Sequence, residues 1–276
     1  MAGMLYLVPT PIGNLGDISL RCRETLEAAD FIAAEDTRVS LKLLNHLDIK
    51  KPLVSYYEHN RADSGPKILA RILAGETCAL VSDAGSPAIS DPGEDLVALC
   101  AANGVTVSAI PGPCAAITAL SISGLPTGRF TFEGFLSTNK KNRQDHLKAL
   151  VREERTMIFY EAPHKLLNTL QDMTETFGGD RRISLCRELT KLHEEVLRTT
   201  LQGALEHYAE LAPRGEYVLI LEGAAPAEEE TLTLEDALSM VSYAMESGLS
   251  RKDAVKQVAK ETGIAKNALY DAALKL

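Results

Sequence analysis

LVSDAGSPAISDPG, residues 80–93, changes character partway along. Ala79, Leu80 and Val81 form a short apolar run, which is typical of a buried strand. The residues from Ser82 to Gly93 are small or polar and include two prolines and two aspartates, so they cannot fill a hydrophobic core. We therefore expect this loop to leave room beside its backbone for a bound molecule, although glycine and proline also form simple turns.

Apolar and amphipathic segments alternate on both sides of this stretch. The N-terminal half predicts strands at residues 5–8, 31–34, 53–57, 77–82 and 105–110. Helices are predicted between them at residues 19–29, 39–47, 66–74 and 94–103, with Pro66 in the first turn of its helix. This alternation indicates an α/β fold with a largely parallel sheet covered on both faces.

The pattern shifts after Gly112. Strands are predicted at residues 130–136, 157–160, 183–187, 195–200 and 217–222, with helices at 115–123 and 143–154. Apolar and polar residues alternate in several of these strands, which favours a mixed or antiparallel second sheet.

Composition shifts divide the chain into four parts. The expected parts are an N-terminal α/β domain (1–124), a second α/β domain (125–223), an acidic linker (224–232) and a small C-terminal helical domain (233–276). In the helical tail, Ser250 and Asp253 resemble a capping box, and Gly263 separates two helices at the spacing of a helix-turn-helix. Such a tail binds nucleic acid or forms a small interaction bundle.

The composition narrows the classes of function. The 276 residues include 45% apolar residues and carry a formal charge of −9, whereas a nucleic-acid-binding protein usually has a basic excess. The five cysteines form no metal-binding spacing, so we expect no metal and a cytoplasmic location. No apolar run reaches eighteen residues, so no membrane association is expected.

Four loops of glycine, proline and small polar residues follow predicted strands. They are PTPIGN (9–14), SDAGSPAISDPG (82–93), IPGPCAA (110–116) and YEAPHK (160–165). GxGxxG, GxxxxGK[ST] and GxSxG motifs are absent, which argues against phosphate-cradling cofactor folds. In open α/β sheets, ligands bind beyond the carboxyl ends of the strands, so the four loops together predict a binding site there.

These motifs also resemble a known family. PTPIGN, AAEDTR (33–38), YYEHN (56–60), VSDAGSPAISDPG, IPGPCAAITAL and FYEAPH resemble the tetrapyrrole-methylase superfamily, and within it the ribosomal RNA small subunit methyltransferase I subfamily. The resemblance covers residues 4–223, and the helical tail also fits the subfamily. It implies two α/β domains that hold S-adenosylmethionine in the cleft between them. It also implies a homodimer that 2′-O-methylates the ribose of a cytidine in 16S rRNA, free or within the small ribosomal subunit.

The resemblance implies a set of cofactor-binding residues at matching positions. They are Pro11, Asp83, Gly85, Ser86, Ile89, Cys114, Ala115, Glu161, Ala162 and Leu189. Many relatives have Gly-Asp-Pro where this chain has Gly85-Ser86-Pro87, which leaves open whether Asp83 or Asp91 supplies the carboxylate.

Two polar clusters, Glu35-Asp36-Thr37-Arg38 and Glu58-His59-Asn60-Arg61, directly follow predicted strands. They suggest catalytic and substrate-binding groups. We expect Asp36 or His59 to assist deprotonation of the ribose hydroxyl. Residues expected to bind RNA phosphates are Arg38, Arg61, Lys140, Lys141 and Arg143. These clusters are equally compatible with solvated loops that contain internal Asp36–Arg38 or Glu58–Arg61 ion pairs.

Two other functions fit the same residues. One is a methyltransferase that acts on a tetrapyrrole ring. The other is a nucleic-acid-binding protein that senses a ligand through its α/β body and catalyses no reaction.

Overall fold

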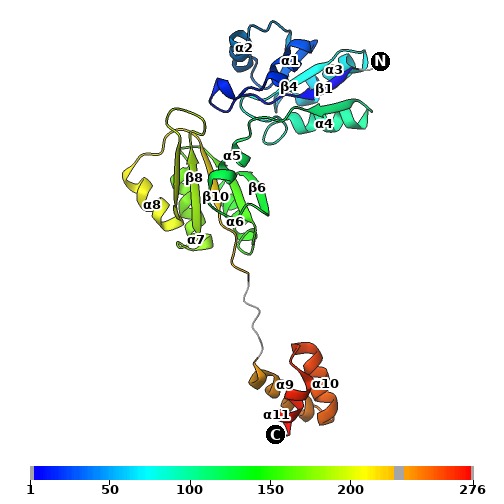
Figure 1. Cartoon of the computed structure of the whole chain (residues 1–276), viewed down its shortest axis with the longest axis vertical. Helices are drawn as coiled ribbons and strands as arrows, with labels where there is room; N and C mark the ends of the chain where they lie inside the picture. The colour runs from blue at the N-terminus through cyan, green and yellow to red at the C-terminus, as the bar shows by residue number, and fades with distance from the viewer. Residues whose placement is uncertain (1–2, 227–232, 275–276) are drawn as a thin grey trace. The chain divides into compact units, whose positions relative to one another are not determined.

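The computed structural model describes residues 3–226 and 233–274. The chain divides into two compact units, Met1–Ala224 and Ala225–Leu276. Figure 1 traces the chain through both units, and each unit is described separately below. Within the described residues, no helix is both long and apolar enough to cross a membrane.

The first unit begins with a five-stranded parallel sheet. Its strands lie in the order β3-β2-β4-β1-β5. Their bounds are β1 (Met4–Leu7), β2 (Phe31–Ala34), β3 (Leu53–Ser55), β4 (Cys78–Val81) and β5 (Thr106–Ala109). Leu7 pairs with Leu80 on one side and with Ala109 on the other, so β1, β4 and β5 end at the same level. The predicted parallel sheet is confirmed.

Helices cover both faces of this sheet, as its continuously apolar strands predict. Phe31 and Ala33 of β2 face a core that includes residues of α3 (Arg61–Leu73) and α4 (Gly93–Ala102). Ile32 and Ala34 face the opposite core, against α1 (Leu20–Ala28) and α2 (Thr37–His46). A short 3-10 helix, η1 (Leu15–Asp17), precedes α1.

Helix α3 begins earlier than the sequence indicated. We expected residues 66–74 with Pro66 in the first turn, but the helix starts at Arg61 and Pro66 lies inside it. The residues before Pro66 include Gly65, which is buried beside Leu99 and Tyr56 and leaves room for close packing. Tertiary packing therefore overrides the local preference of proline for a helix start.

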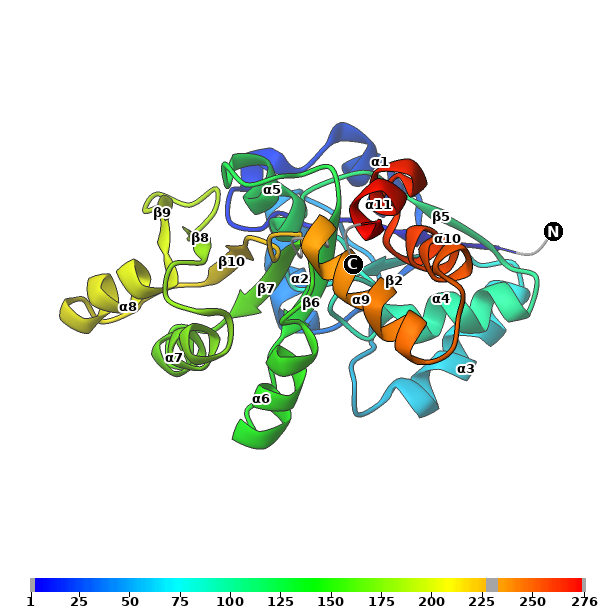
Figure 2. The same cartoon turned by 90° about the horizontal axis from the view of Figure 1, so that it is seen from below.

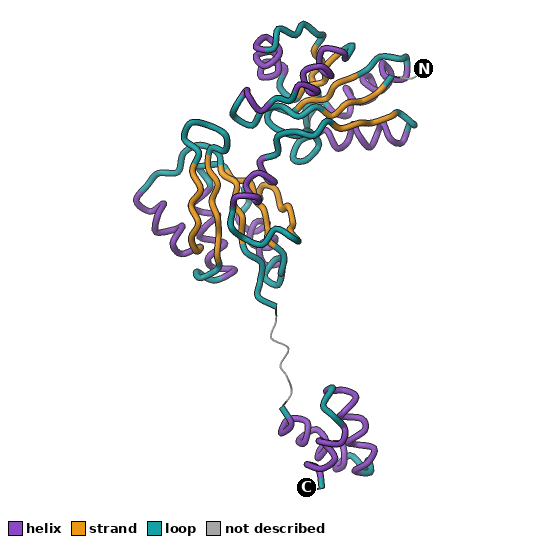
Figure 3. The backbone as a smooth tube through the Cα atoms, viewed as in Figure 1, coloured by secondary structure: helices purple, strands orange, loops and turns teal. Residues whose placement is uncertain are grey.

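The second sheet is mixed, as its alternating strands predicted. It has the order β6-β7-β10-β8-β9, with β6 parallel to β7 and the other pairs antiparallel. The bounds are β6 (Phe130–Phe135), β7 (Thr156–Glu161), β8 (Arg182–Arg187), β9 (Glu195–Thr200) and β10 (Tyr217–Leu221). Figure 3 shows the strands of each sheet side by side.

Four helices flank the second sheet. Its larger core includes residues of α6 (Lys140–Ala149), α7 (Leu166–Phe177) and α8 (Leu201–Glu210). Helix α5 (Ala115–Ile122) packs on the opposite face. The sequence did not indicate α7 and α8, and the helix expected at residues 143–154 instead spans Lys140–Ala149 as α6.

The C-terminal unit is a three-helix bundle with its own core. Helices α9 (Leu234–Glu246), α10 (Arg251–Thr262) and α11 (Lys266–Ala273) bury Ala237, Val241, Val255 and Leu269 between them. Figure 2 shows the three helices packed against one another. Gly263 ends α10 in the left-handed region (φ 72°), and α11 starts three residues later, as the helix-turn-helix spacing predicted.

The predicted domain boundaries stay a prediction. The first sheet uses residues 4–109 and the second uses 130–221, which is compatible with a boundary at 124/125. Residues 227–232 of the predicted linker lie outside the described residues.

Candidate cofactor cavity and active site

Three loops meet beyond the carboxyl ends of β1, β4 and β5. The backbones of Thr10 and Gly85 exchange two hydrogen bonds of 3.0 Å, which joins the loop after β1 to the loop after β4. The Ser86 hydroxyl donates to the carbonyl oxygen of Pro113 at 2.9 Å, which joins the loop after β4 to the loop after β5. The loops singled out from the sequence therefore form one connected structure at the predicted edge of the sheet.

Two glycines permit these close approaches. Gly85 has φ +85°, and a Cβ there would lie 3.1 Å from Cγ2 of Ile12. A Cβ on Gly112 would lie 2.7 Å from Cβ of Pro9, which is closer than carbon atoms pack. Glycine is thus required at position 112 because no Cβ fits there. At position 85 it is favoured both by the limited space and by the positive φ angle.

The Asp91 side chain shapes the loop after β4. Its Oδ1 accepts hydrogen bonds from the backbone N–H groups of Ala88 (2.9 Å) and Gly93 (3.0 Å). Asp91 therefore folds the loop back onto the start of α4, and Ala88 there adopts φ +67°. This is the turn-forming role of aspartate that the sequence left open for Asp83 and Asp91.

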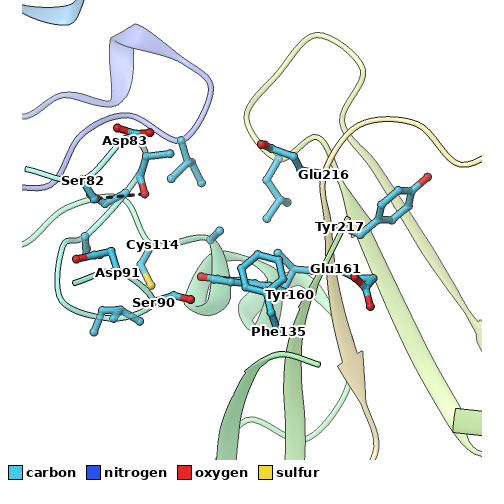
Figure 4. A pocket seen from close by; sticks show the side chains of 18 of the residues that line it. Ser82, Asp83, Ser90, Asp91, Cys114, Phe135, Tyr160, Glu161, Glu216 and Tyr217 are labelled. Atoms are coloured by element: carbon cyan, nitrogen blue, oxygen red, sulfur yellow. Dashed lines mark hydrogen bonds between the residues drawn. The ribbon is translucent and has the colours of Figure 1, made fainter. Parts of the chain in front are cut away.

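A cavity of about 540 Å³ lies between these loops and one edge of the second sheet. Figure 4 shows Ser82, Asp83, Ser90, Asp91 and Cys114 on one side, and Phe135, Tyr160, Glu161, Glu216 and Tyr217 on the other. The second wall is formed by the ends of β6 and β7 and the start of β10. These strand ends lie side by side because Tyr217 pairs with Glu161, and Tyr160 pairs with Phe135. The volume is in the range of small-molecule sites.

The polar lining of the cavity is acidic. Five acidic residues are among those that line it, Glu35, Asp83, Asp91, Glu161 and Glu216, of which Glu161 is buried and accepts a hydrogen bond from the Thr169 hydroxyl of α7. Of the described residues that line the cavity, none is lysine, arginine or histidine. A phosphate-bearing ligand would be repelled here, whereas a ligand with a positive charge would be stabilised.

Glu35 and Asp83 lie at the ends of neighbouring strands, β2 and β4. Burial raises the pKa of Glu35 above its ordinary 4.5, and the negative charges of Asp83 and Asp91 raise it further. Burial also raises the pKa of Asp83, although the backbone N–H of Asp36 donates to its Oδ1 at 3.0 Å. Raised carboxylate pKa values inside a cleft are typical of groups that exchange protons during catalysis.

The structure brings together nine of the ten predicted cofactor-binding residues. Those that line the cavity are Asp83, Gly85, Ser86, Ile89, Cys114, Ala115, Glu161, Ala162 and Leu189. Pro11 does not line it; its neighbour Ile12 does, and Ile12 also lies against Gly85. The role of these residues in binding a cofactor stays a prediction.

The two predicted catalytic residues lie outside the cavity lining. Asp36 caps α2 and holds the Arg38 side chain through Nε–Oδ1 (3.0 Å) and Nη2–Oδ2 (2.6 Å) contacts. This hydrogen bonding lowers the pKa of Asp36 to about 2, so the group is a weak base. His59 is exposed in the turn before α3, edge-on to Tyr57 at 6.1 Å. Glu35, which is adjacent to Asp36 in sequence, is the carboxylate that enters the cavity.

Three of the predicted phosphate-binding arginines are engaged in ion pairs. Arg38 pairs with Asp36, and Arg61 with Asp95 on α4 rather than with Glu58. Arg143 is largely buried against Asp172 of α7 at 2.6 Å. Lys140 and Lys141, in contrast, are exposed in the first turn of α6.

Several lining residues were not predicted as site residues. They are Ile12, Glu35, Ser82, Ala84, Ser90, Phe135, Tyr160, Pro163, Cys186, Glu216, Tyr217 and Val218; Asp91, which the sequence offered only as an alternative to Asp83, lines the cavity as well. Glu35, Ser82 and Asp91 stood within the quoted motifs, so their position after a strand was a usable signal. Tyr217 begins β10 and Glu216 directly precedes it, and no local pattern shows that this strand start reaches the cavity.

The fold and cavity define a class of proteins. The family model of the Tetrapyrrole (Corrin/Porphyrin) Methylases matches residues 4–205, which contain the first sheet and four strands of the second. A second family model, the RsmI C-terminal HTH domain, matches residues 232–276.

Similar proteins with curated names narrow the family assignment within the tetrapyrrole methylases. A ribosomal RNA small subunit methyltransferase I from Synechocystis sp. is 48% identical over 274 residues, covering 99% of this chain and 98% of the relative. The protein of that name from Halalkalibacterium halodurans is 48% identical over 272 residues, covering 98% and 94%. The chain belongs to the ribosomal RNA small subunit methyltransferase I family within the tetrapyrrole methylases.

Solved structures share the fold of the first unit. Uroporphyrin-III C-methyltransferase from Thermus thermophilus, complexed with S-adenyl homocysteine, has a TM-score of 0.55 and 19% identity over 80% of this chain and 97% of that one. Diphthine synthase has a TM-score of 0.61 and 13% identity, covering 80% and 90%. At these identities the likeness concerns the fold alone.

Proposed function

We propose that this protein uses S-adenosylmethionine to methylate the ribose 2′-hydroxyl of a cytidine in 16S rRNA. The observation that carries the proposal is the acid-lined cavity at the strand ends, in a chain of this family. Relatives named for small-subunit rRNA support the class of substrate. The cytidine and the 2′-hydroxyl rest on the sequence resemblance. A cytoplasmic location follows from the substrate.

The residues of the cavity fit this cofactor. S-adenosylmethionine supplies a methyl group activated by a positively charged sulfonium, and it also carries an amino group. The carboxylates complement these charges, and Gly85 lets the backbone approach a ligand. We assign cofactor binding to Gly85, Ser86, Cys114 and Ala115 on the first wall, and to Ala162 and Leu189 on the second.

Glu35 is the proposed base in place of Asp36 or His59. A ribose hydroxyl is a poor nucleophile, so a carboxylate that accepts its proton increases the rate. Glu35 lines the cavity, and burial together with Asp83 and Asp91 raises its pKa. It accepts a proton more readily than a solvated carboxylate would. Positioning of the hydroxyl by the cavity walls supplies the remainder of the catalysis.

An acidic cavity requires that the RNA backbone be held elsewhere. Lys140 and Lys141 are exposed at the start of α6. In the helical unit, Lys252, Lys256 and Lys260 are exposed on α10 at spacings of four residues, which places them along one face. We assign phosphate contacts to these two groups, and binding should weaken with salt as counterion release requires.

We also propose that the protein is a homodimer, on the basis of the resemblance. Size-exclusion chromatography with light scattering tests this directly. A mass of two chains supports the dimer, and the mass of one chain across the working concentration range contradicts it.

Methyl transfer from radiolabelled S-adenosylmethionine tests the function. Small ribosomal subunits, free small-subunit rRNA and a tetrapyrrole precursor are offered in parallel, and nuclease digestion maps the label. Label on a ribose 2′-oxygen is the expected result. Label on the tetrapyrrole alone contradicts the RNA substrate, and cofactor binding without any transfer favours the ligand-sensor alternative.

A further inference from the structure

Phe135, the last residue of β6, presents an aromatic ring to the cavity while remaining 56% exposed. Single exposed apolar residues are common, so exposure alone assigns no role. Phe135 differs because the same ring lines the acidic cavity. The β-strand geometry and the packing beneath the ring show why it faces this way.

A β-bulge turns Phe135 toward the cavity. Phe132 pairs with Ile158, but the next pair is Gly134 with Phe159, so Glu133 is an extra residue in β6. Gly134 has φ +65°, which glycine adopts at little cost. In a regular strand, Phe132 and Phe135 would point to opposite faces. The bulge places both on the same face, and bulges that redirect a side chain are common beside active sites.

Tyr160 packs against the ring of Phe135 and fixes its position. The rings of Phe135 and Tyr160 are edge-to-face, with centroids 5.4 Å apart at 62°. Phe132 contacts the same tyrosine at 5.1 Å and 73°. The Tyr160 hydroxyl accepts a hydrogen bond from the backbone N–H of Ala116 at 3.2 Å, and burial raises the pKa of Tyr160 to about 12. The supporting ring is therefore uncharged and fixed in place, while one face of Phe135 stays open.

The position of Phe135 suits a base of the substrate. Figure 4 shows Phe135 and Tyr160 together, across the cavity from Asp83, Asp91 and Cys114. Single-stranded RNA is recognised through splayed nucleotides, whose ribose can enter such a cavity while the unstacked base binds on an aromatic side chain. We propose that Phe135 is the platform on which the target pyrimidine base stacks while its ribose enters the cavity. This inference rests on the proposed function.

The chain offers a spectroscopic test because it contains no tryptophan. Phe135→Trp introduces a single tryptophan at the platform, whose emission can be excited separately from that of the eight tyrosines. Phe130→Trp is the matched control, since Phe130 begins the same strand, is 39% exposed and does not line the cavity. Small ribosomal subunits are titrated into each variant in the presence of S-adenosylhomocysteine. Quenching and a shifted emission of Phe135→Trp, with little change for Phe130→Trp, are expected.

Kinetics of Phe135→Ala give the second measurement. Stacking of a base on an aromatic ring contributes ~1–3 kcal/mol, so kcat/KM for small subunits should fall about 5- to 150-fold. The affinity for S-adenosylhomocysteine, measured by calorimetry, should change less than about twofold, and Phe135→Trp should retain most activity. Phe130→Ala should behave like the unmodified chain in both assays.

Different results would refute the proposed function and the proposed stacking role of Phe135. If the unmodified chain methylates no rRNA, the proposed function is wrong. If it does, and Phe135→Ala keeps its kcat/KM while the emission of Phe135→Trp is unchanged by subunits, the platform alone is wrong. A loss of S-adenosylhomocysteine affinity in Phe135→Ala would also overturn it, because the ring would then contact the cofactor.

Discussion

The Arg143–Asp172 ion pair should be one of the strongest single contributions to the stability of the first unit. The Arg143 side chain is 13% exposed and that of Asp172 is 5% exposed, with Nε and Oδ2 2.6 Å apart. The other partners are weaker: Gln144 donates to Asp172 at 3.3 Å, and Arg143 donates to the carbonyl oxygen of Ser137 at 3.2 Å. Removal of either charge leaves the other buried without compensation.

Arg143→Met removes the charge and keeps much of the side-chain volume. Breaking a buried pair costs about 3–5 kcal/mol, so with an m-value of about 3 kcal/mol/M the urea midpoint should fall by about 1–2 M. The double variant Arg143→Met/Asp172→Leu should recover most of the loss, because apolar residues of similar volume can replace a buried pair. Far-UV circular dichroism of the full chain in urea gives the midpoint for each variant.

Arg38→Met is the matched control, because Arg38 also pairs with an aspartate but its side chain is 86% exposed. Its midpoint should not differ measurably from that of the unmodified chain. If Arg143→Met behaves like Arg38→Met, or if the double variant is no more stable than the single one, the reasoning from burial is refuted.

Three further predictions concern the site. In Gly85→Ala the loop after β4 should relax in the free protein to avoid placing an alanine at φ +85°, and ligand binding must restore that conformation at about 1–2 kcal/mol, so affinity for S-adenosylhomocysteine should fall about 5- to 30-fold by calorimetry; unchanged affinity would refute the role of this loop in binding. The folded chain holds a proton on Glu35 more tightly than the unfolded chain, so the stability that Glu35 contributes falls as pH rises from 4.5 through the raised pKa, while methyl transfer increases over the same interval; the difference in stability between the unmodified chain and Glu35→Gln should show the first trend, Glu35→Gln should lose the second, and an intact acid limb of the rate profile would exclude Glu35 as base. Lys256→Gln should reduce the salt slope of RNA binding by about 1, with Lys42→Gln on α2 as the control; equal slopes would count against α10.

The strand-end loops could be recognised in the sequence because the residues that mark them, an apolar run followed by glycine, proline and small polar residues, are adjacent in the chain. Three small-residue loops follow strands of the parallel sheet, and parallel strands end at one edge of their sheet, so the meeting of Thr10 with Gly85 follows from the pattern. Ser19 could likewise be recognised as a helix cap, and its hydroxyl accepts from the N–H of Cys22.

The second wall could not be predicted in this way. Phe135 reaches the cavity only because of a bulge at Glu133, and a one-residue change of register reverses the direction of a side chain. Asp36 and Glu35 are adjacent in sequence, and only the cap of α2 decides which carboxylate turns away. Arg143 resembled a surface charge until its partner, 29 residues later on α7, was placed. In each case the deciding contact is distant in sequence.

The distribution of the five thiols allows occupancy of the cavity by a ligand to be measured through cysteine alkylation. Cys22, Cys78, Cys100 and Cys186 are buried, and burial raises the pKa of Cys78 to about 12 and of Cys186 to about 11, which suppresses the reactive thiolate. Cys114 and Cys186 both line the cavity, but Cys186 is fully buried whereas Cys114 is partly exposed. A mild alkylating reagent should therefore modify one position, at a rate set by how often the cavity is empty. Ligand affinity can then be read from labelling kinetics, without any methyl transfer.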